Sequence, residues 1–189
     1  LSIRHRFDDV SYDTLVSNSV KEVGFEVGFG RGQFLRQWAS QHREHFLIGV
    51  EVRKSIVRDV QQQIDMLGLT NVSLVHGNAS IFLEDVIPDS VLDHVFVFHP
   101  DPWFKKRHHK RRVINTHFLT LIYQKLKSTG KLYISTDVEL LWQDILLQMN
   151  FTSFKALDHD LFWEQVYTSH WHSFSIKDKR QLHFQTFIK

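Results

Sequence analysis

Short apolar segments alternate with segments of helical periodicity along most of this chain. Apolar runs typical of buried strands occupy residues 23–27, 45–51, 71–77, 90–100 and 131–136. Apolar residues recur at helical spacing in residues 33–40, 54–67, 117–126 and 138–149, and two further β-like segments lie around 151–156 and 182–188. This alternation predicts an α/β fold with a mostly parallel sheet and helices on both faces.

The length and composition fit one soluble domain, which we expect to span residues 1–189. Hydrophobic residues make up 42% and charged residues 23% of the chain, as in folded soluble proteins. No apolar run is long enough to span a bilayer, and no signal-peptide pattern is present. The chain has no cysteine, so it contains no disulfides, and we expect a cytoplasmic protein. Because the first residue is Leu1 and not Met, we also expect residues upstream of it.

Polar or glycine-rich residues follow each of the five predicted strands. In parallel sheets the carboxyl ends of the strands meet at one edge, where ligands bind. A single binding site at that edge is therefore predicted. Its candidate residues are Glu26 to Gly32, Glu51, Asn78, Asp101 and Asp137.

The turn after the first strand has the sequence EVGFGRG, with glycine at positions 28, 30 and 32. Glycine adopts backbone angles closed to other residues and lets a ligand approach the main chain. The dinucleotide fingerprint would require glycine at position 33, which is Gln33, so an NAD-linked oxidoreductase is disfavoured. The carboxylate of Glu26 would repel a pyrophosphate but attract a cation. S-adenosylmethionine carries a sulfonium and an ammonium and no phosphate, so the turn favours this cofactor, with Gly28 and Gly30 against it.

The ends of the second and third strands supply candidates for the rest of such a cofactor. Glu51 lies about 20 residues beyond the glycine turn, where an acid accepts hydrogen bonds from ribose hydroxyls. Asn78 and Ala79 follow the third strand, where the adenine would lie, and the amide of Asn78 could bond the purine edge.

Asp101 lies between two of the three prolines of the chain, Pro100 and Pro102. Proline fixes its own φ and favours an extended conformation in the residue before it, so this acid has little backbone freedom. Its position predicts a preorganised carboxylate facing the transferable methyl group. The alternative is an ordinary capping or turn-forming Asp. Aromatic side chains that could hold an unstacked base are Trp103, Phe104, Trp163, Trp171 and Phe174.

Positive charge is concentrated in KKRHHKRR, residues 105–112, which holds six of the 23 Lys and Arg residues and no acid. The rest of the chain has 17 such bases against 21 acids, a net charge of about −4. A basic segment on an acidic body indicates contact with a polyanion such as nucleic acid, although a solvated surface is the alternative. The 13 histidines lack metal-ligand spacing such as H-E-x-x-H, so no metal is expected.

Taken together, these motifs resemble those of the bacterial tRNA (guanine-N7-)-methyltransferase family. The resemblance runs in order across nearly the whole chain, through EVGFGRG, GVEV, HPDPWFKKRHHKRR and STDVE. It implies a class I methyltransferase fold, a doubly wound, mostly parallel seven-stranded sheet of Rossmann-like type with an antiparallel last strand. It also implies methyl transfer from S-adenosylmethionine to N7 of a guanosine in the tRNA variable loop.

The resemblance also implies roles for individual residues. Asp101 would be the active-site acid and would meet the cofactor, together with Glu26, Glu51 and Asn78. The substrate would meet Lys105, Asp137, Ser169 and His172. The RNA would lie along residues 107–112, that is, against Arg107, His108, Lys110, Arg111 and Arg112.

Three positions depart from the family pattern. His99 stands where the family usually has an apolar or small residue, and Asn78 replaces a usual acid. The family's late Thr-x-aromatic-Glu motif corresponds to residues 169–172, so His172 replaces a glutamate. Two alternatives therefore stay open: a cofactor-binding RNA-binding module with weak or no catalysis, and a methyltransferase with another acceptor. We expect tRNA as the partner and no association with a membrane. The expected oligomeric state is a monomer or homodimer.

Overall fold

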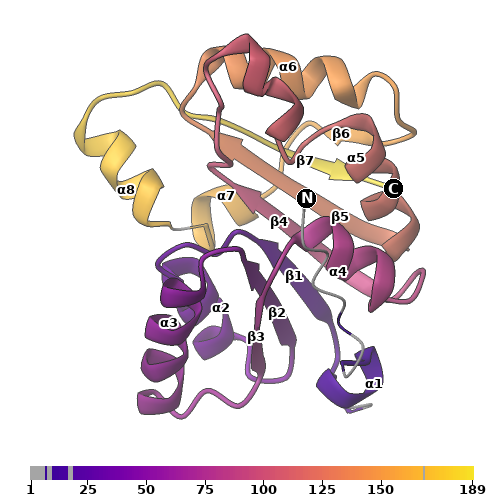
Figure 1. Ribbon diagram of the computed structural model, residues 1–189, viewed down its shortest axis with the longest axis vertical. Helices are drawn as coiled ribbons and strands as arrows, with labels where there is room; N and C mark the ends of the chain where they lie inside the picture. Colours follow the sequence, from indigo (N-terminus) through magenta and orange to yellow (C-terminus); the bar gives the residue numbers. More distant parts are fainter. Residues whose placement is uncertain (1–6, 8–9, 17–18, 168) are drawn as a thin grey trace.

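A computed structural model describes residues 7, 10–16, 19–167 and 169–189 (Figure 1). One mixed sheet runs through the described part of the chain, in the order β3-β2-β1-β4-β5-β7-β6. Its strands are β1 (Val23–Val27), β2 (Phe46–Glu51), β3 (Val72–His76), β4 (Leu92–Phe98), β5 (Leu126–Thr136), β6 (Lys155–Leu157) and β7 (His183–Ile188).

Strands β1 to β5 pair in parallel, and β7 is antiparallel to both β5 and β6. The chain builds outward from β1 to β3, then crosses to β4 on the other side of β1. The strand order thus reverses between β1 and β4, which makes their carboxyl ends the expected ligand site of such a sheet. The predicted doubly wound, seven-stranded sheet with an antiparallel last strand is confirmed.

Helices cover both faces of the sheet (Figure 1). Side chains of α4, α5 and α6 form one core with the strands, and those of α2, α3 and α7 form the other. The helices are α1 (Tyr12–Leu15), α2 (Gln33–Gln41), α3 (Lys54–Met66), α4 (Ala79–Asp85), α5 (Thr116–Lys125), α6 (Glu139–Met149), α7 (Phe162–Gln165) and α8 (His170–Lys177), with a 3-10 helix, η1 (Lys106–Arg111).

The central strands are apolar throughout because each one faces both cores. In β4, Val95 and Val97 belong to the core under α4 to α6, whereas the alternating Phe96 and Phe98 belong to the core under α2, α3 and α7. Successive side chains of a strand point to opposite faces, so a doubly covered strand needs apolar residues at every position. This packing holds the carboxyl end of β4, and with it His99 to Asp101, at the centre of one sheet edge.

Some predicted boundaries were wrong. A helix over residues 117–126 and a strand over 131–136 were expected, but β5 begins at Leu126 and contains the Ser-Thr-Gly stretch, residues 128–130, that lies between them. The pairing of β5 with β4 shifts register between Leu92 and His94, so the strand accommodates this irregular stretch. Helix α4 and the short elements η1, α7 and α8 were not predicted.

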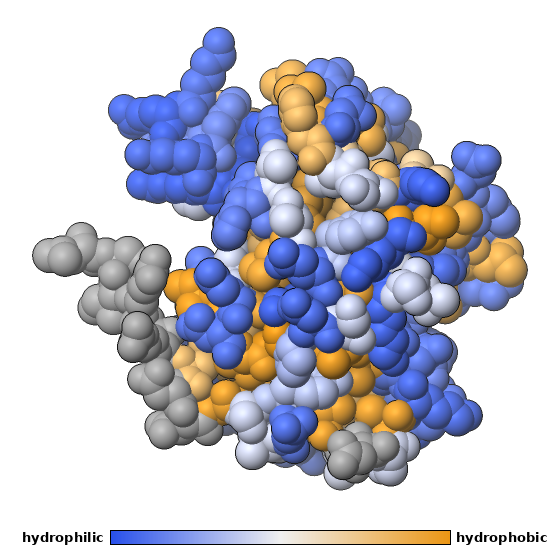
Figure 2. All heavy atoms as spheres, turned by 90° about the vertical axis from the view of Figure 1, so that its right-hand side faces the viewer, coloured by the Kyte–Doolittle hydropathy of each residue, from blue (hydrophilic) through white to orange (hydrophobic). Residues whose placement is uncertain are grey.

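The face shown in Figure 2 carries hydrophobic residues in scattered patches among hydrophilic ones. No described helix has both the length and the apolar character needed to cross a lipid bilayer.

Candidate active site at the carboxyl ends of the strands

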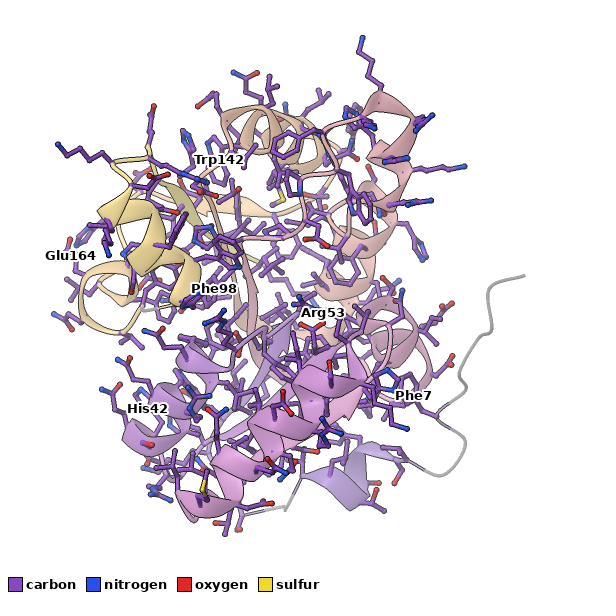
Figure 3. All side chains as sticks on the ribbon, turned by 60° about the vertical axis from the view of Figure 1, so that its left-hand side comes forward. Phe7, His42, Arg53, Phe98, Trp142 and Glu164 are labelled. Carbon is purple, nitrogen blue, oxygen red and sulfur yellow. The ribbon has the colours of Figure 1, made fainter. Side chains whose placement is uncertain are left out.

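A cavity of about 660 Å³ opens at the carboxyl ends of β1, β2 and β4. This volume lies within the range of about 300–1,000 Å³ that is usual for small-molecule sites. Figure 3 labels Phe98 and Arg53, two of the residues that line it. Other lining residues come from the sequence-predicted candidates: Glu26, Gly28, Gly30, Glu51, Ala79, Asp101, Trp103, Arg111, Ser169 and Trp171.

The glycine turn leaves the floor of this cavity open. Gly28 has φ 69°, in the left-handed region, and a Cβ there would meet nothing within 4 Å. Its backbone N–H donates to Val50 O at 2.7 Å, which fixes the turn against β2. Gly32, at φ 65°, has a packing reason as well, because a Cβ would lie 2.6 Å from Val60 Cγ1. The turn therefore exposes main chain to the cavity while α3 packs closely behind it.

Glu26 is a deeply buried acid of the site, with 4% of its surface exposed. Its Oε2 has no hydrogen-bond partner among the described residues. Burial, with a further contribution from Glu51, raises the pKa of its carboxyl to about 8. A buried carboxylate oxygen at the wall of a cavity is costly unless a cation or donor meets it. The site is thus built to receive a positively charged group beside β1.

Glu51 is also buried, at the end of β2, but its carboxylate is well bonded. Oε2 accepts from Gly30 N at 3.2 Å, and Oε1 accepts from Arg53 N at 3.0 Å. The Arg53 guanidinium donates to both oxygens, at 3.1 and 3.3 Å. Arg53 itself is 62% exposed, so it can move aside for hydroxyl groups that compete for Glu51. No sequence signal beyond its nearness to Glu51 pointed to Arg53.

Backbone strain flanks the Pro100–Asp101–Pro102 segment. His99 has φ 46° and Trp103 has φ 45°, which are uncommon for residues with side chains. Such angles cost energy and persist where the surroundings impose them, typically at functional sites. Asp101 is exposed and lines the cavity that the glycine turn also lines. Asp101 and residues 28–31 of the glycine turn thus line one cavity.

The basic run divides into an exposed part and one buried residue. Lys105, Arg107, Lys110 and Arg111 are exposed, and His108 is half-buried. The Arg111 guanidinium lies 5.1 Å from the centroid of the Trp103 ring, at the cavity wall. Arg111 thus presents positive charge at the cavity, and the other exposed cations continue that charge along the chain, where an anionic strand can meet them.

Arg112, expected to contact RNA, is only 7% exposed. Its Nη1 donates to Asp144 Oδ2 at 2.7 Å, its Nε donates to Pro102 O at 2.9 Å, and its Nη2 lies 3.1 Å from His109 Nε2. The structure therefore does not present Arg112 to a polyanion. Its guanidinium holds the segment around Asp101 against α6.

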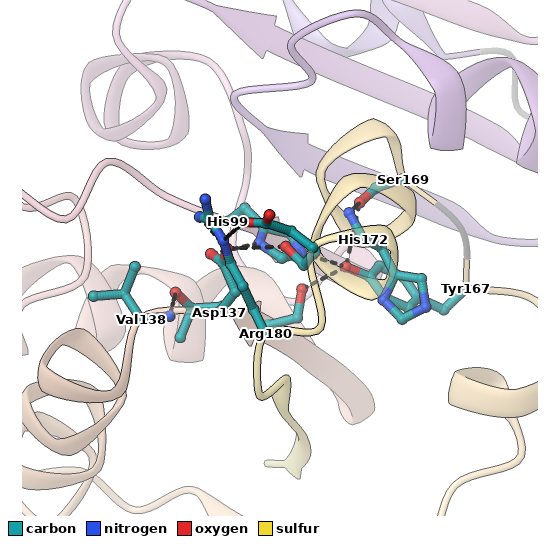
Figure 4. Close-up of polar contacts among 11 residues, drawn as sticks. His99, Asp137, Val138, Tyr167, Ser169, His172 and Arg180 are labelled. Atoms are coloured by element: carbon teal, nitrogen blue, oxygen red, sulfur yellow. Dashed lines mark hydrogen bonds and ion pairs between the residues drawn. The ribbon is translucent and has the colours of Figure 1, made fainter.

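Asp137, expected to meet the substrate, is engaged in a buried network behind the cavity (Figure 4). Its Oδ2 accepts from Ser175 Oγ at 2.9 Å and from Arg180 Nη1 at 3.0 Å, and its Oδ1 lies 3.3 Å from His99 Nδ1. Burial alone would raise the pKa of Asp137, but the bonds from Ser175, Arg180 and His99 outweigh it and lower that pKa. Asp137 thus ties α8 to the end of β4.

His99 continues the network toward β5. Burial lowers the pKa of His99 more than Asp137 raises it, so the ring is neutral near pH 7. Nδ1 donates to Asp137, which leaves Nε2 to accept from the Tyr167 hydroxyl at 3.0 Å. That hydroxyl is also 2.7 Å from Ser135 Oγ. The histidine that departs from the family pattern therefore links β4, β5 and the segment before α8. Tyr167 had no sequence signal.

The remaining candidates divide between the cavity and its surroundings. Asn78 is exposed and caps α4, because its Oδ1 accepts from Ser80 N at 2.9 Å and Ile81 N at 3.3 Å. Ser169 lines the cavity and caps α8 by accepting from His172 N at 2.9 Å. The His172 ring packs edge-to-face on Tyr167, and its Nδ1 has no partner among the described residues. Trp163 donates to Thr186 Oγ1 at 2.9 Å, away from the cavity.

The strand order and the cavity at its reversal point define a class I methyltransferase fold. The solved structure of the 16S rRNA methyltransferase KamB matches with a TM-score of 0.66 at 13% identity, over 90% of this chain and 89% of that one. The aminoglycoside resistance methyltransferase NpmB1 matches with a TM-score of 0.62 at 18% identity, over 90% and 88%. Identities this low support the fold alone.

A family model described as "Putative methyltransferase" matches residues 21–186, so the chain belongs to that methyltransferase family. The tRNA (guanine-N(7)-)-methyltransferase of Nitrosococcus oceani is 37% identical over 134 residues, which are 71% of this chain and 55% of that protein. The protein of the same name from Shewanella oneidensis is 41% identical over 128 residues, which are 68% of this chain and 54% of that protein. The family resemblance noted in the sequence is confirmed, and the chain spans about half the length of these curated relatives.

Proposed function

We propose that this chain transfers a methyl group from S-adenosylmethionine to N7 of a guanosine in the variable loop of tRNA. The observation that carries the proposal is that one cavity is lined by Glu26, Gly28, Gly30 and Asp101, with Arg111 at its wall. Relatives named tRNA (guanine-N(7)-)-methyltransferases support the choice of acceptor. The proposal includes action in the cytoplasm, as a single domain in a monomer or homodimer; the cysteine-free composition is compatible with that compartment.

The residues present fit the cofactor. The unpartnered oxygen of Glu26 suits a cationic group, the open main chain at Gly28 admits a close ligand, and Glu51 suits ribose hydroxyls. Ala79 lies in the wall where the adenine is expected. The amide nitrogen of Asn78 remains a candidate donor beside it, since only the oxygen caps α4. When bound, S-adenosylmethionine supplies an electrophilic methyl group on a sulfonium.

The acceptor needs placement more than it needs a base. The N7 lone pair of guanine is free at neutral pH, so attack on a methyl carbon requires no proton removal. Asp101, held between two prolines, accepts hydrogen bonds from the guanine N1–H and N2–H and faces the positive charge that develops on the purine. Such a bidentate contact also discriminates against adenine by about 1–3 kcal/mol. Asp137 supports this geometry through His99.

Reaching the cavity requires the guanosine to leave its stack. Enzymes that modify bases extrude the target nucleotide into a pocket and hold it by stacking and by hydrogen bonds to its edge. Trp103 offers a flat wall for this purpose, and Arg111 lies over its ring. The exposed cations of residues 105–111 hold the neighbouring phosphates.

Incubation with unmodified tRNA transcripts and cofactor labelled in the methyl group tests this function. We expect label in the tRNA, recovered as 7-methylguanosine after digestion to nucleosides. A transcript in which adenosine replaces the variable-loop guanosine is the matched control and should take up no label. Label in another nucleoside, or label in protein or small molecules only, would contradict the proposal. Cofactor binding without any transfer would favour the non-catalytic RNA-binding module.

A further inference from the structure

Helix α8 presents large aromatic side chains to solvent beside the cavity. Ser169, His170 and Trp171, at its start, line the cavity. Trp171 is 53% exposed and Phe174, one turn further, is 42% exposed. Their ring centroids are 5.6 Å apart in an edge-to-face arrangement. Contiguous exposed apolar side chains, unlike single scattered ones, mark candidate contact surfaces.

One cationic side chain lies over the Phe174 ring, and two more are exposed at the end of α8. The Arg180 guanidinium lies 5.2 Å from the centroid of the Phe174 ring, and Lys177 and Lys179 are exposed nearby along the chain. Residues 177–180 thus hold three cations and one acid, Asp178. Aromatic rings interleaved with cations are the composition of surfaces that bind single-stranded nucleic acid, because every base has a face that can stack.

A second aromatic ring with a nearby arginine lies at the cavity wall. There the Arg111 guanidinium lies 5.1 Å from the centroid of the Trp103 ring, at the end of the basic run. Both Trp103 and Trp171 line the cavity that Asp101 also lines. The cavity is therefore lined by an aromatic ring from each of two segments, Trp103 beside the basic run and Trp171 of α8, although the sequence shows a dense basic run near Trp103 only.

We propose that α8 is a second RNA-contacting surface, on which unpaired nucleotides next to the target guanosine stack against Trp171 and Phe174. Lys177 and Lys179 would hold the phosphates of those nucleotides. The bonds of Asp137 with Ser175 and Arg180 keep α8 in place against the end of β5. This inference rests on the proposed function, because it assigns the surface to the same RNA that enters the cavity.

Single variants Trp171→Ala and Phe174→Ala test the stacking, with Phe151→Ala as the matched control. Phe151 is 68% exposed and lies beyond α6, outside the cavity lining. Alanine favours helix and the replaced side chains are exposed, so the fold should survive, which circular dichroism and cofactor binding would verify. Each α8 variant should bind unmodified tRNA at least about five-fold more weakly, whereas the control should match the wild type. Trp171→Phe, which keeps a ring, should recover most of the affinity.

Two short RNA probes, one unpaired and one fully duplex, separate stacking from general affinity. The α8 variants should lose affinity for the unpaired probe and keep that for the duplex. Equal losses of affinity for both probes, or tRNA binding as tight as in Phe151→Ala, would overturn the assignment of α8, as would a protein partner that α8 binds in place of RNA. A wild-type chain that methylates tRNA in the same assays would leave the proposed function standing. A wild-type chain that binds no tRNA would remove both.

Discussion

The guanidinium of Arg112 bridges Asp144 of α6, at 2.7 Å, and the carbonyl of Pro102, at 2.9 Å. These two contacts hold Pro102, the residue that follows Asp101, against helix α6. Arg111, its neighbour, instead turns toward Trp103 and the cavity wall. Two adjacent arginines of one charged segment therefore have different physical tasks, one internal and one facing a ligand.

Arg112→Ala should lower the free energy of unfolding by about 2 kcal/mol or more, because it removes a buried partner of Asp144 and Pro102. Asp144 is 28% exposed, and its solvation keeps the decrease below that of a fully buried pair. Arg111→Ala, on the exposed side, should stay within about 0.5 kcal/mol of the wild type but weaken tRNA binding. Urea denaturation and tRNA titration of both variants check this. If Arg112→Ala weakened tRNA binding without loss of stability, and Arg111→Ala destabilised the fold, Arg112 would be the residue that meets RNA.

Glu26 should make the stability of the cofactor-free protein depend on pH. The pKa of Glu26 is about 8 in the folded chain, against an ordinary value of 4.5. Between these pH values the folded chain therefore keeps a proton on Glu26 that the unfolded chain has lost. The free energy of unfolding should therefore fall as pH rises from about 5 to 8. Glu26→Gln lacks this titration and should gain stability relative to the wild type, on the order of 1 kcal/mol per pH unit.

The same Glu26→Gln variant should bind S-adenosylmethionine more weakly, because the amide cannot supply the negative charge that a cationic ligand needs. In the wild type, binding near pH 7 should release a proton, since a cation favours the ionised carboxylate. Calorimetry in buffers of different ionisation enthalpy measures this release. Parallel pH–stability curves for the two proteins, together with equal cofactor affinities, would mean that Glu26 does not face the ligand.

The exposed cations of the basic run should set the salt dependence of tRNA binding. Lys110→Gln and Arg111→Gln together should flatten the log–log slope of affinity against salt by roughly 0.7–0.9 for each phosphate that the variant no longer neutralises. Arg112 is excluded from this set because its guanidinium is buried. Lys155→Gln, which removes an exposed charge on β6, serves as the control. If the slope stays at the wild-type value, the run is a solvated surface.

His99 should contribute a decrease in stability on mild acidification. Burial lowers its pKa in the folded chain, so below about pH 6.5 the unfolded chain binds a proton more readily than the folded one. Stability is therefore complete at neutral pH and falls as the pH drops toward the folded pKa. In His99→Gln the decline between pH 7 and 5 should be shallower. His172, whose pKa burial also lowers, is present in both proteins and cancels in the comparison.

The order of strands and helices could be predicted because its signals are local. Residues 23–27, for example, form the predicted strand with the same bounds, since an apolar run between turn residues needs no distant information. The Ser-Thr-Gly stretch at 128–130 misled the prediction because Leu126 and Lys131, on either side of it, both pair with β4, so the strand runs on through the stretch as an irregularity. Helix α4 was missed because it is short and its capping residue, Asn78, was assigned to the cofactor alone.

The chemistry of the site could be predicted only where a motif carries it. Gly28, Glu51 and Asp101 follow strand ends, so topology alone brings them to one cavity. Arg112 is the same residue type as Arg111 and lies in the same basic run, so the sequence does not distinguish the two. Its buried position depends on a bond to Asp144, 32 positions away. Likewise, Asp137 bonds with Ser175 and Arg180, which lie in and just after helix α8, an element that the sequence did not predict. Pairings across such separations follow from packing, which a single sequence does not display.

The role of Asp101 is the claim on which the proposed chemistry depends most. The direct measurement is single-turnover methyl transfer to unmodified tRNA by wild type and Asp101→Ala, with cofactor affinity determined for both in parallel. We predict that the variant binds the cofactor within about two-fold of the wild type while transfer falls by about 100-fold or more. Transfer at the wild-type rate by a variant with intact cofactor binding would contradict the account.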